Sequence, residues 1–508
     1  AAIKSHNESL HQNDFCDYKS SGRFICRQFA HQTLVKFYAN LHCGFCPKKY
    51  NRILKGENMK NVLALFNHSL KEIMFLKRLQ LGLIHVAVAM TLVPINSTLN
   101  RVMIKELSLS ATLVAILASL PYLFAPIQVA IGAYSDRHPI LGLRRTPYIL
   151  AGLILCVIGV IVSPQVAFLM AENFPLGVFA GIFAFGAWGM GYNLSAVSYL
   201  SLASELSGEN GRGKTIATMW FMMIVSIIAT AIGLSRMIDP YTPEALIRAF
   251  GYVAASALTL GLLGLIRLEP RSGSVADLSP HSESYSFKQM NAAIVSNPTA
   301  RTFFIYLLLL LAAILGQDVL LEPFGAEAFN MTVTQTTQIT SIWGTFVLIA
   351  ILIAGILEGR VAKKSIAQVG NIGALLGFVV IVASGLTRST GIFYTGVTLL
   401  GLGTGLSTVA NLSLMFDFTM PGMVGLYIGA WGFSNALSRL TGSILGGVVR
   451  DVVNQATGAA LSGYLVVFII EAFMLLIAAV MLTRIDVQKF QKGAEEPSFV
   501  EKVALASD

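Results

Sequence analysis

The sequence predicts an all-α membrane protein with about twelve transmembrane helices arranged as two six-helix halves. Three observations support this prediction. First, 55% of the 508 residues are hydrophobic and only 12% are charged, whereas a soluble domain carries about 25% charged residues. Second, apolar runs of about 20 residues, each long enough to cross a bilayer, follow one another along the chain. Third, one stretch of sequence recurs where a six-helix duplication would place it.

The apolar runs place the expected helices between residues 79 and 483. Their ranges are 79–99, 110–134, 147–168, 177–203, 214–235, 248–267, 302–321, 336–357, 366–386, 391–416, 423–447 and 463–483. The longest polar interruption, 268–300, contains Pro and Ser and is interpreted as a linker. It separates an N-terminal half at 59–267 from a C-terminal half at 301–484, which a polar tail at 485–508 follows.

Residues 1–58 differ in composition from the rest of the chain. They are polar and basic, and the first methionine is Met59. One hypothesis is that 1–58 is an upstream extension and that the working protein begins at Met59; the alternative is a transit or regulatory segment. Cys43 and Cys46 form a C-x-x-C motif, but the second pair that a zinc site needs is missing. We therefore expect no metal site.

The distribution of Lys and Arg predicts the orientation. If both termini lie on the cytoplasmic side, the inner loops, linker and tails hold most of the basic residues, as the positive-inside rule requires. The outer loops then hold only Arg101, Lys105, Arg236, Arg248, Arg388 and Arg450. These basic loops account for the net charge of +9 without a basic domain outside the membrane, so we expect no nucleic-acid partner.

An internal repeat relates the fourth and tenth expected helices. Residues 189–202 read GMGYNLSAVSYLSL and residues 401–414 read GLGTGLSTVANLSL, which agree at 8 of 14 positions. Both stretches are rich in Gly and Leu, so chance similarity is the alternative. The pairing of helix four with helix ten nevertheless matches a duplication of six helices.

Two loops that share a residue pattern extend this repeat. Each has a glycine, an acid and an arginine, then a basic pair: Gly132, Asp136, Arg137, Arg144 and Arg145 after the second helix, and Gly355, Glu358, Arg360, Lys363 and Lys364 after the eighth. The acid could accept charge-assisted hydrogen bonds from arginines and a helix N-terminus. We interpret each set as a conformational clasp that holds the two halves in one state.

The string from Gly132 to Arg145 resembles the loop signature of the major facilitator superfamily. The resemblance covers about residues 59–484 and implies the major facilitator fold, in which two six-helix halves are related as parallel repeats. The antiporter and sugar-porter motifs of that superfamily are absent from this sequence.

Charged residues inside a membrane span are costly and are functional candidates by default. The first and fourth helices of the N-terminal half have none before Glu205, so this half offers no obvious proton carrier. The C-terminal half holds four buried-charge candidates, Asp318, Asp417, Arg439 and Glu471. Arg439 needs a partner, for which Asp417 on the preceding helix is the candidate. Asp318 and Glu322 share a helix face and are interpreted as carboxylates in water at the outer end of helix seven.

A closer resemblance is to the PucC/LhaA-type family of phototrophs, the bacteriochlorophyll-delivery branch of the superfamily. Three separate stretches carry it: SDRHP followed by GLRRTPY in 135–148, NLSAVSYLSLA in 193–203, and GLYIGAWG in 425–432. It implies an assembly factor for light-harvesting or photosystem complexes that handles chlorophyll or bacteriochlorophyll. It also implies a thylakoid or bacterial inner (intracytoplasmic) membrane, with pigment, membrane lipids and pigment-binding apoproteins as partners.

The residues are compatible with such a cargo. The magnesium of a chlorin takes one axial nitrogen or oxygen ligand, and His85 is the only histidine in an expected helix. Gln128 and Asn193 are further candidate ligands. A histidine that packs between helices is the plainer interpretation of His85.

Two other functions remain as alternatives. A secondary transporter of a small solute would use Asp318, Asp417, Arg439 or Glu471 as coupling groups. An enzyme is not expected, because the loops contain no paired carboxylates, nucleophile–base pair or metal-ligand spacing.

Overall fold

The computed structural model describes residues 75–124, 127, 131, 134, 135, 138–270, 287–419 and 424–494. The chain divides into two compact units, 1–73 and 74–508. The first unit lies outside the described residues, so the fold is that of the second. Its elements are helices, apart from an isolated β-bridge between Ile140 and Leu143 among the described residues.

Ten helices of the described part are long and apolar enough to cross a membrane, and each coincides with a predicted span. They are Phe75–Glu106, α7 (Thr146–Glu172), the two limbs Phe174–Ser207 and Gly211–Met237 of α8 (Phe174–Met237), α9 (Pro243–Leu265), Pro298–Val319, α13 (Val333–Leu357), α14 (Lys363–Thr387), α15 (Thr390–Asp417) and α17 (Ala460–Arg484). This confirms the prediction of an all-α membrane protein.

The two other predicted spans, 110–134 and 423–447, are not among these ten helices. The range 110–134 contains the short helices α4 (Ala111–Ala118) and α5 (Leu120–Leu123), and part of it lies outside the described residues. Residues 424–447 of the range 423–447 belong to α16 (Val424–Thr457), a single helix of 34 residues. The count of twelve is therefore approximate.

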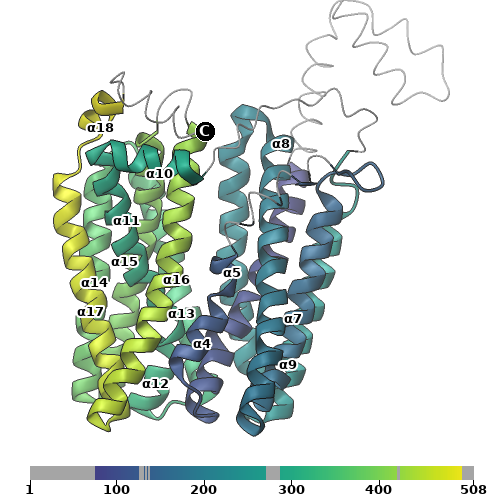
Figure 1. Ribbon diagram of the computed structural model, residues 1–508, viewed down its shortest axis with the longest axis vertical. Helices are drawn as coiled ribbons and strands as arrows, with labels where there is room; N and C mark the ends of the chain where they lie inside the picture. The colour runs from purple at the N-terminus through teal and green to yellow at the C-terminus, as the bar shows by residue number, and fades with distance from the viewer. Residues whose placement is uncertain are drawn as a thin grey trace, which may run out of the picture. The chain divides into compact units, whose positions relative to one another are not determined.

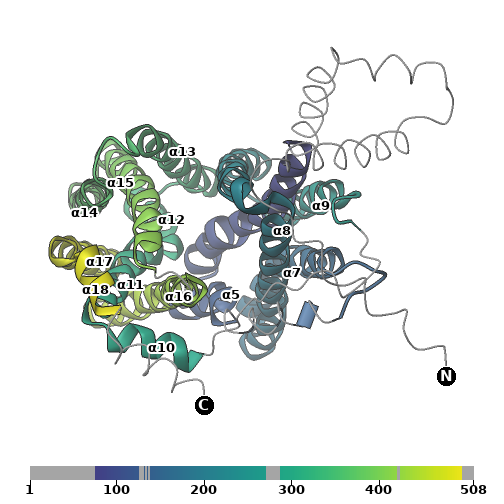
Figure 2. The same cartoon turned by 90° about the horizontal axis from the view of Figure 1, so that it is seen from above.

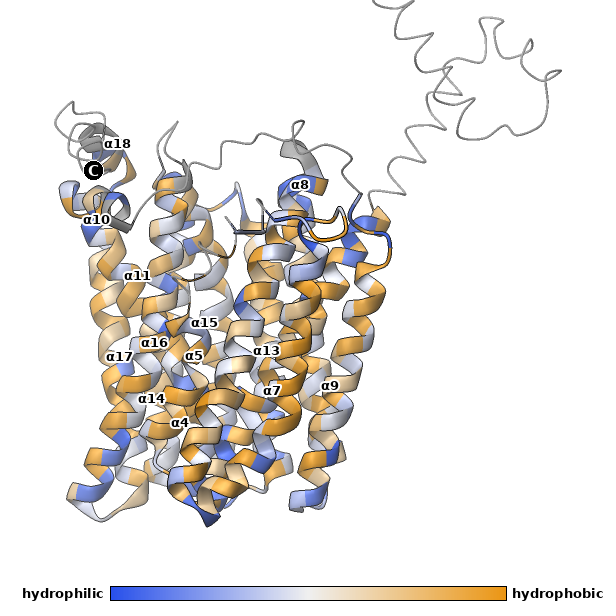
Figure 3. Cartoon of the chain, turned by 45° about the vertical axis from the view of Figure 1, so that its right-hand side comes forward, coloured by the Kyte–Doolittle hydropathy of each residue, from blue (hydrophilic) through white to orange (hydrophobic). Residues whose placement is uncertain are grey.

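The helices gather in two groups (Figures 1 and 2). In the group drawn in purple to blue, α7 packs against α8 and α9. In the group drawn in green to yellow, α14 packs against α15 and α17, and α11 (Pro298–Gly316) packs against α16 and α17. The helix surfaces are largely apolar along their length, with hydrophilic residues at both ends (Figure 3).

In both halves, a glycine of the preceding helix packs closely against the repeated stretch. A Cβ at Gly152 of α7 would lie 2.4 Å from the Ser195 hydroxyl of α8, and a Cβ at Gly370 of α14 would lie 2.5 Å from the Ser407 amide nitrogen of α15. Ser195 and Ser407 hold the same place in the repeated stretch. Small residues thus let the backbones touch in both halves, as close packing of membrane helices requires.

The first and seventh spans are irregular at corresponding places. The first span contains two π-helical segments, η2 (Pro94–Leu99) and η3 (Val102–Glu106), and Pro94 lacks the amide hydrogen that a regular helix would use. The seventh leaves α11 at Gly316, passes through the 3₁₀ turn η5 (Gln317–Val319) and continues as α12 (Leu321–Phe329). Both irregular segments lie toward the lower end of Figure 1, which holds α4 and α12.

Two short helices lie at the upper end of Figure 1: α10 (Phe287–Ser296), in the range predicted as the linker, and α18 (Val487–Ala494), in the predicted tail. The side-chain amide of Asn297 donates to the Phe490 carbonyl oxygen at 3.1 Å and ties α18 to the start of α11.

Candidate functional site

His85 lies in an aromatic cluster formed by three helices. Its side chain, in the first span, is 7% exposed, and its Nδ1 atom is buried with no hydrogen-bond partner among the described residues. The ring lies 5.1 Å from that of Tyr199 on the first limb of α8 and 6.2 Å from that of Trp220 on the second limb. Trp220 is 42% exposed, so one side of the cluster reaches the surface of the helix bundle.

The other two candidate pigment ligands are placed differently. Asn193 is fully buried, and its amide nitrogen donates to the carbonyl oxygens of Pro121 at 2.7 Å and Gly189 at 2.9 Å. The side chain thereby connects α5 to α8, about two helical turns from Tyr199. Gln128 lies outside the described residues.

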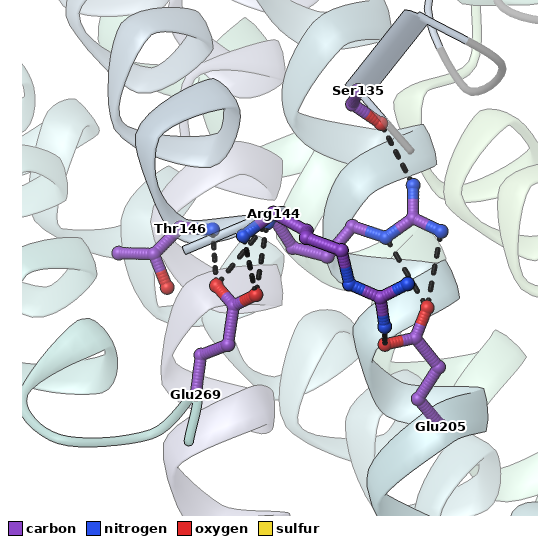
Figure 4. Close-up of polar contacts among 6 residues, drawn as sticks. Ser135, Arg144, Thr146, Glu205 and Glu269 are labelled. Carbon is purple, nitrogen blue, oxygen red and sulfur yellow. Dashed lines mark hydrogen bonds and ion pairs between the residues drawn. The ribbon is translucent and has the colours of Figure 1, made fainter. Parts of the chain in front are cut away.

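The basic pair of the N-terminal half binds two acids (Figure 4). Arg145 donates to Glu205 at 3.0 Å, and Arg144 pairs with the same carboxylate at 3.4 Å. Glu269 accepts from the backbone amides of Arg144, Arg145 and Thr146 at 2.7–3.1 Å. This carboxylate thus caps the N-terminus of α7, where negative charge is favoured.

The remaining members of this clasp are only partly described. Arg145 also donates to the Ser135 hydroxyl at 2.8 Å, which brings the preceding loop into the cluster. Gly132, Asp136 and Arg137 lie outside the described residues.

The C-terminal half repeats this arrangement. Lys363 binds both oxygens of Asp417 at 2.7 and 2.8 Å, and Lys364 donates to the carbonyl oxygens of Thr483 and Ile485. Asp417 follows Glu205 by the same 212 positions that separate the repeated stretches. The basic pair of each half therefore joins the end of the fourth or tenth helix to the end of the sixth or twelfth.

This geometry differs from the clasp expected from the sequence in two ways. The described bonds of both basic pairs stay within one half, rather than joining the halves. The acid that binds the pair in the C-terminal half is Asp417, whereas Glu358 and Arg360 are exposed after the end of α13. The loop pattern missed this because the acid lies more than 50 residues further along the chain.

A second charged cluster lies between the halves. Arg439 of α16 lies 3.7 Å from Asp318 and 3.1 Å from the Tyr122 hydroxyl of α5, with its guanidinium over the Tyr122 ring. The expected pairing of Arg439 with Asp417 is wrong, because Asp417 binds Lys363. Asp318 also accepts from Gln317 at 2.8 Å. Arg439, Asp318 and Tyr122 line a small cavity together with Asn96.

Two further carboxyl groups are buried in the C-terminal half. Glu471 of α17 is 4% exposed, and no residue that the structure describes forms a hydrogen bond with its Oε2 atom. It lines a neighbouring cavity with Gly442 and Met474. Glu322 is 3% exposed, so its interpretation as a carboxylate in water at a helix end is wrong. The 3₁₀ turn η5 interrupts the seventh span before α12, and Glu322 lies buried after this interruption. The periodicity of a regular helix does not predict that burial.

Opposite halves are joined at the lower end of Figure 1. Asp451 of α16 accepts from the Ser110 hydroxyl at 2.7 Å and from the Thr112 amide at 2.8 Å, and so caps α4. Arg101 donates to the Met331 carbonyl oxygen at 3.2 Å, and Lys105 pairs with Glu327. The Thr98 and Thr337 hydroxyls lie 3.0 Å apart.

Comparison with known protein families gives one match that covers most of the chain. The model of the family described as "PUCC protein" matches residues 98–490. Among curated relatives, a protein named PucC from Rhodobacter capsulatus is 32% identical over 423 residues, which cover 80% of this chain and 92% of that protein. A protein from the same species named "Bacteriochlorophyll synthase 44.5 kDa chain" is 26% identical over 416 residues, 80% of this chain and 95% of that protein.

Solved structures similar to this chain are transporters. A D-xylose–proton symporter gives a TM-score of 0.63 at 16% identity, covering 81% of this chain and 97% of its own. A bacterial homologue of the lysosomal transporter Spinster gives 0.64 at 13% identity, covering 84% and 99%. At these identities the similarity establishes the major facilitator fold alone.

Proposed function

The chain belongs to the PucC protein family, and from that membership we propose that it is an integral membrane factor that holds chlorophyll or bacteriochlorophyll and delivers it to light-harvesting or photosystem apoproteins during assembly. It works without catalytic turnover. It resides in a thylakoid or bacterial inner (intracytoplasmic) membrane, with both termini on the cytoplasmic side, where the basic loops are favoured.

The observation that carries this proposal is the buried Nδ1 atom of His85, for which the described part of the chain provides no hydrogen-bond partner. A buried polar atom without a partner is uncommon in proteins, and imidazole nitrogen is the commonest metal ligand. Nδ1 of His85 can therefore supply the axial ligand that the magnesium of a chlorin requires. The rings of Tyr199 and Trp220 provide flat apolar faces beside it, which suit the macrocycle.

Access to His85 requires a movement. The side chain is enclosed, and Trp220 is the member of the cluster that reaches the surface. We propose that the macrocycle enters from the membrane side and displaces the Trp220 ring. The pigment would then lie between the first span and the two limbs of α8.

The test is an absorption spectrum of the protein purified in mild detergent from a host that makes the pigment. We expect a chlorophyll or bacteriochlorophyll band at a stoichiometric level. His85→Phe should reduce pigment retention by at least about tenfold, the scale seen when the support of a metal ligand is lost. The matched control is His138→Phe, because His138 is exposed in a loop and should not matter.

The outcomes separate two questions. A colourless wild-type protein would contradict pigment holding. A coloured His85→Phe variant with the same melting temperature as wild type would contradict only the assignment of His85 as the ligand. Co-purification of antenna or photosystem subunits tests the delivery step independently.

A secondary transporter of a small solute is the second candidate. The cluster of Asp318, Arg439 and Tyr122 supports it, because these charged and polar groups line a cavity between the halves. The cavity is small in this conformation, so a solute would require the halves to move apart. Solute flux into liposomes that is lost in Arg439→Gln would favour this function over pigment holding.

A further inference from the structure

The first and seventh spans meet at a buried carboxyl group. Glu322 of α12 accepts hydrogen bonds at Oε1 from the Ser97 hydroxyl of η2 and from the Thr340 hydroxyl of α13, the latter at 2.6 Å. Ser97 belongs to the N-terminal half, whereas Glu322 and Thr340 belong to the C-terminal half. The site therefore exists only while the halves are together at this end.

The surroundings of Glu322 disfavour a negative charge. The side chain is 3% exposed, and Oε2 is buried without a hydrogen-bond partner in the described part of the chain. Two neutral hydroxyls are the donors that reach the carboxyl group in the described structure. A buried ionised carboxylate without a cation costs several kcal/mol, so such a group takes up a proton instead.

The cations Arg101 and Lys105 of the neighbouring elements pair with other acids, and Arg101 acts on Glu322 only through space, against the larger effect of burial. The charged and titratable groups of η3 and its N-cap, η5, α12 and α17 are Arg101, Lys105, Glu106, Asp318, Glu327, Tyr464, Glu471 and, in the last turn of α17, Arg484. Arg101 pairs with Glu106, Lys105 pairs with Glu327, and Asp318 pairs with Arg439. Tyr464 lies under Arg450, and Glu471 is itself acidic. Among the described residues, no cation lies within ion-pair distance of Glu322.

The helix geometry at this point is typical of an ion site. Interrupted helices at corresponding positions of two repeats mark the coupling-ion sites of many transporters. Here η2 of the first span and η5–α12 of the seventh are such a pair, and they meet at Ser97 and Glu322.

We propose that Glu322 is a proton-binding site built jointly by the two halves and that it is protonated in this conformation. When the halves separate at this end, the carboxyl group meets water and releases its proton to it as the carboxylate forms. Proton release is thereby coupled to opening. The proposal does not depend on the cargo, so it stands or falls separately from pigment holding.

The first test detects the proton directly. An infrared spectrum of the purified protein at neutral pH should contain the carbonyl-stretch band of a protonated carboxyl group. Glu322→Gln should remove part of that band, whereas Glu327→Gln should not, since Glu327 pairs with Lys105. A spectrum in which Glu322→Gln leaves the band unchanged would overturn the proposal.

The second test measures the coupling. Spectroscopic labels at Glu172 and Arg388, both exposed at the ends of α7 and α14, report the separation of the halves in a cysteine-free background. In wild type and in Glu327→Gln, we expect the label distance to increase as the pH rises. In Glu322→Gln, which keeps the neutral form, the short distance should persist at every pH.

Two results would overturn the coupling. One is a Glu322→Gln variant with the same pH dependence as wild type. The other is a label distance that changes with Na⁺ concentration at fixed pH and does not change with pH, because the site would then bind a metal cation.

Discussion

Arg439 illustrates how a single residue connects an ion pair of the C-terminal half to the N-terminal half. Its charge lies inside a predicted span and is met by Asp318 at 3.7 Å and by the Tyr122 hydroxyl at 3.1 Å. The side chains of Arg439 and Asp318 are about one-third exposed to the adjoining cavity. The pair is therefore weaker than a fully enclosed one.

Removing one member of this pair should cost more than removing both. Arg439→Met leaves the Asp318 carboxylate without its cation, and we expect a loss of about 1–3 kcal/mol, below the 3–5 kcal/mol of a fully buried pair. The double variant Arg439→Met/Asp318→Asn should recover most of it. Melting temperatures in detergent measure the cycle; additive losses would show that the two residues do not interact.

At the scale of elements, the two basic pairs act as separate braces. Arg144 and Arg145 hold Glu205 in the N-terminal half, and Lys363 holds Asp417 in the C-terminal half. Glu205→Gln should raise amide hydrogen exchange around 144–148 and leave 363–366 unchanged. Asp417→Asn should do the reverse. Increased exchange in both halves from either variant would mean that the braces are coupled across the halves.

The same elements show what the sequence could predict. The ten spans coincide with apolar runs, and the repeat at 189–202 and 401–414 corresponds to two equivalent glycine contacts. Span boundaries and repeats depend on local composition, which a sequence displays. The partners of Arg439 and Arg145 depend on residues more than 50 positions away, and the bend that buries Glu322 depends on how α12 packs. No local pattern encodes these.

At the scale of the whole molecule, most of the described hydrogen bonds and ion pairs between the halves lie at one end. Asp451 caps α4 across the two halves, and Glu322 joins η2 to α12 nearby. Rocking of the halves, as expected for this fold, must break both contacts. The two contacts require different charge states, because Glu322 joins the halves as a neutral carboxyl group, as proposed above, and Asp451 joins them as a carboxylate.

Asp451 provides the last prediction because it should respond to pH differently from Glu322. It lies beyond the predicted span 423–447. Burial alone would raise its pKa, but hydrogen bonds from Ser110 and Thr112 and the bond from Arg450 hold the pKa below its usual value. The stabilisation is then fully present above the unfolded-state pKa of about 3.9 and is lost only as the pH falls through the lower folded-state value.

The Asp451 contact should therefore be constant between about pH 5 and pH 8. Asp451→Asn should lengthen the distance between labels at Glu172 and Arg388 at every pH in that range, while the increase with rising pH remains. Glu322→Gln should abolish the increase and keep the distance short. Among the described residues, Glu322 and Asp451 are the acids that join the halves through hydroxyl donors. If Asp451→Asn abolished the pH dependence instead, the proton that controls opening would therefore belong to Asp451.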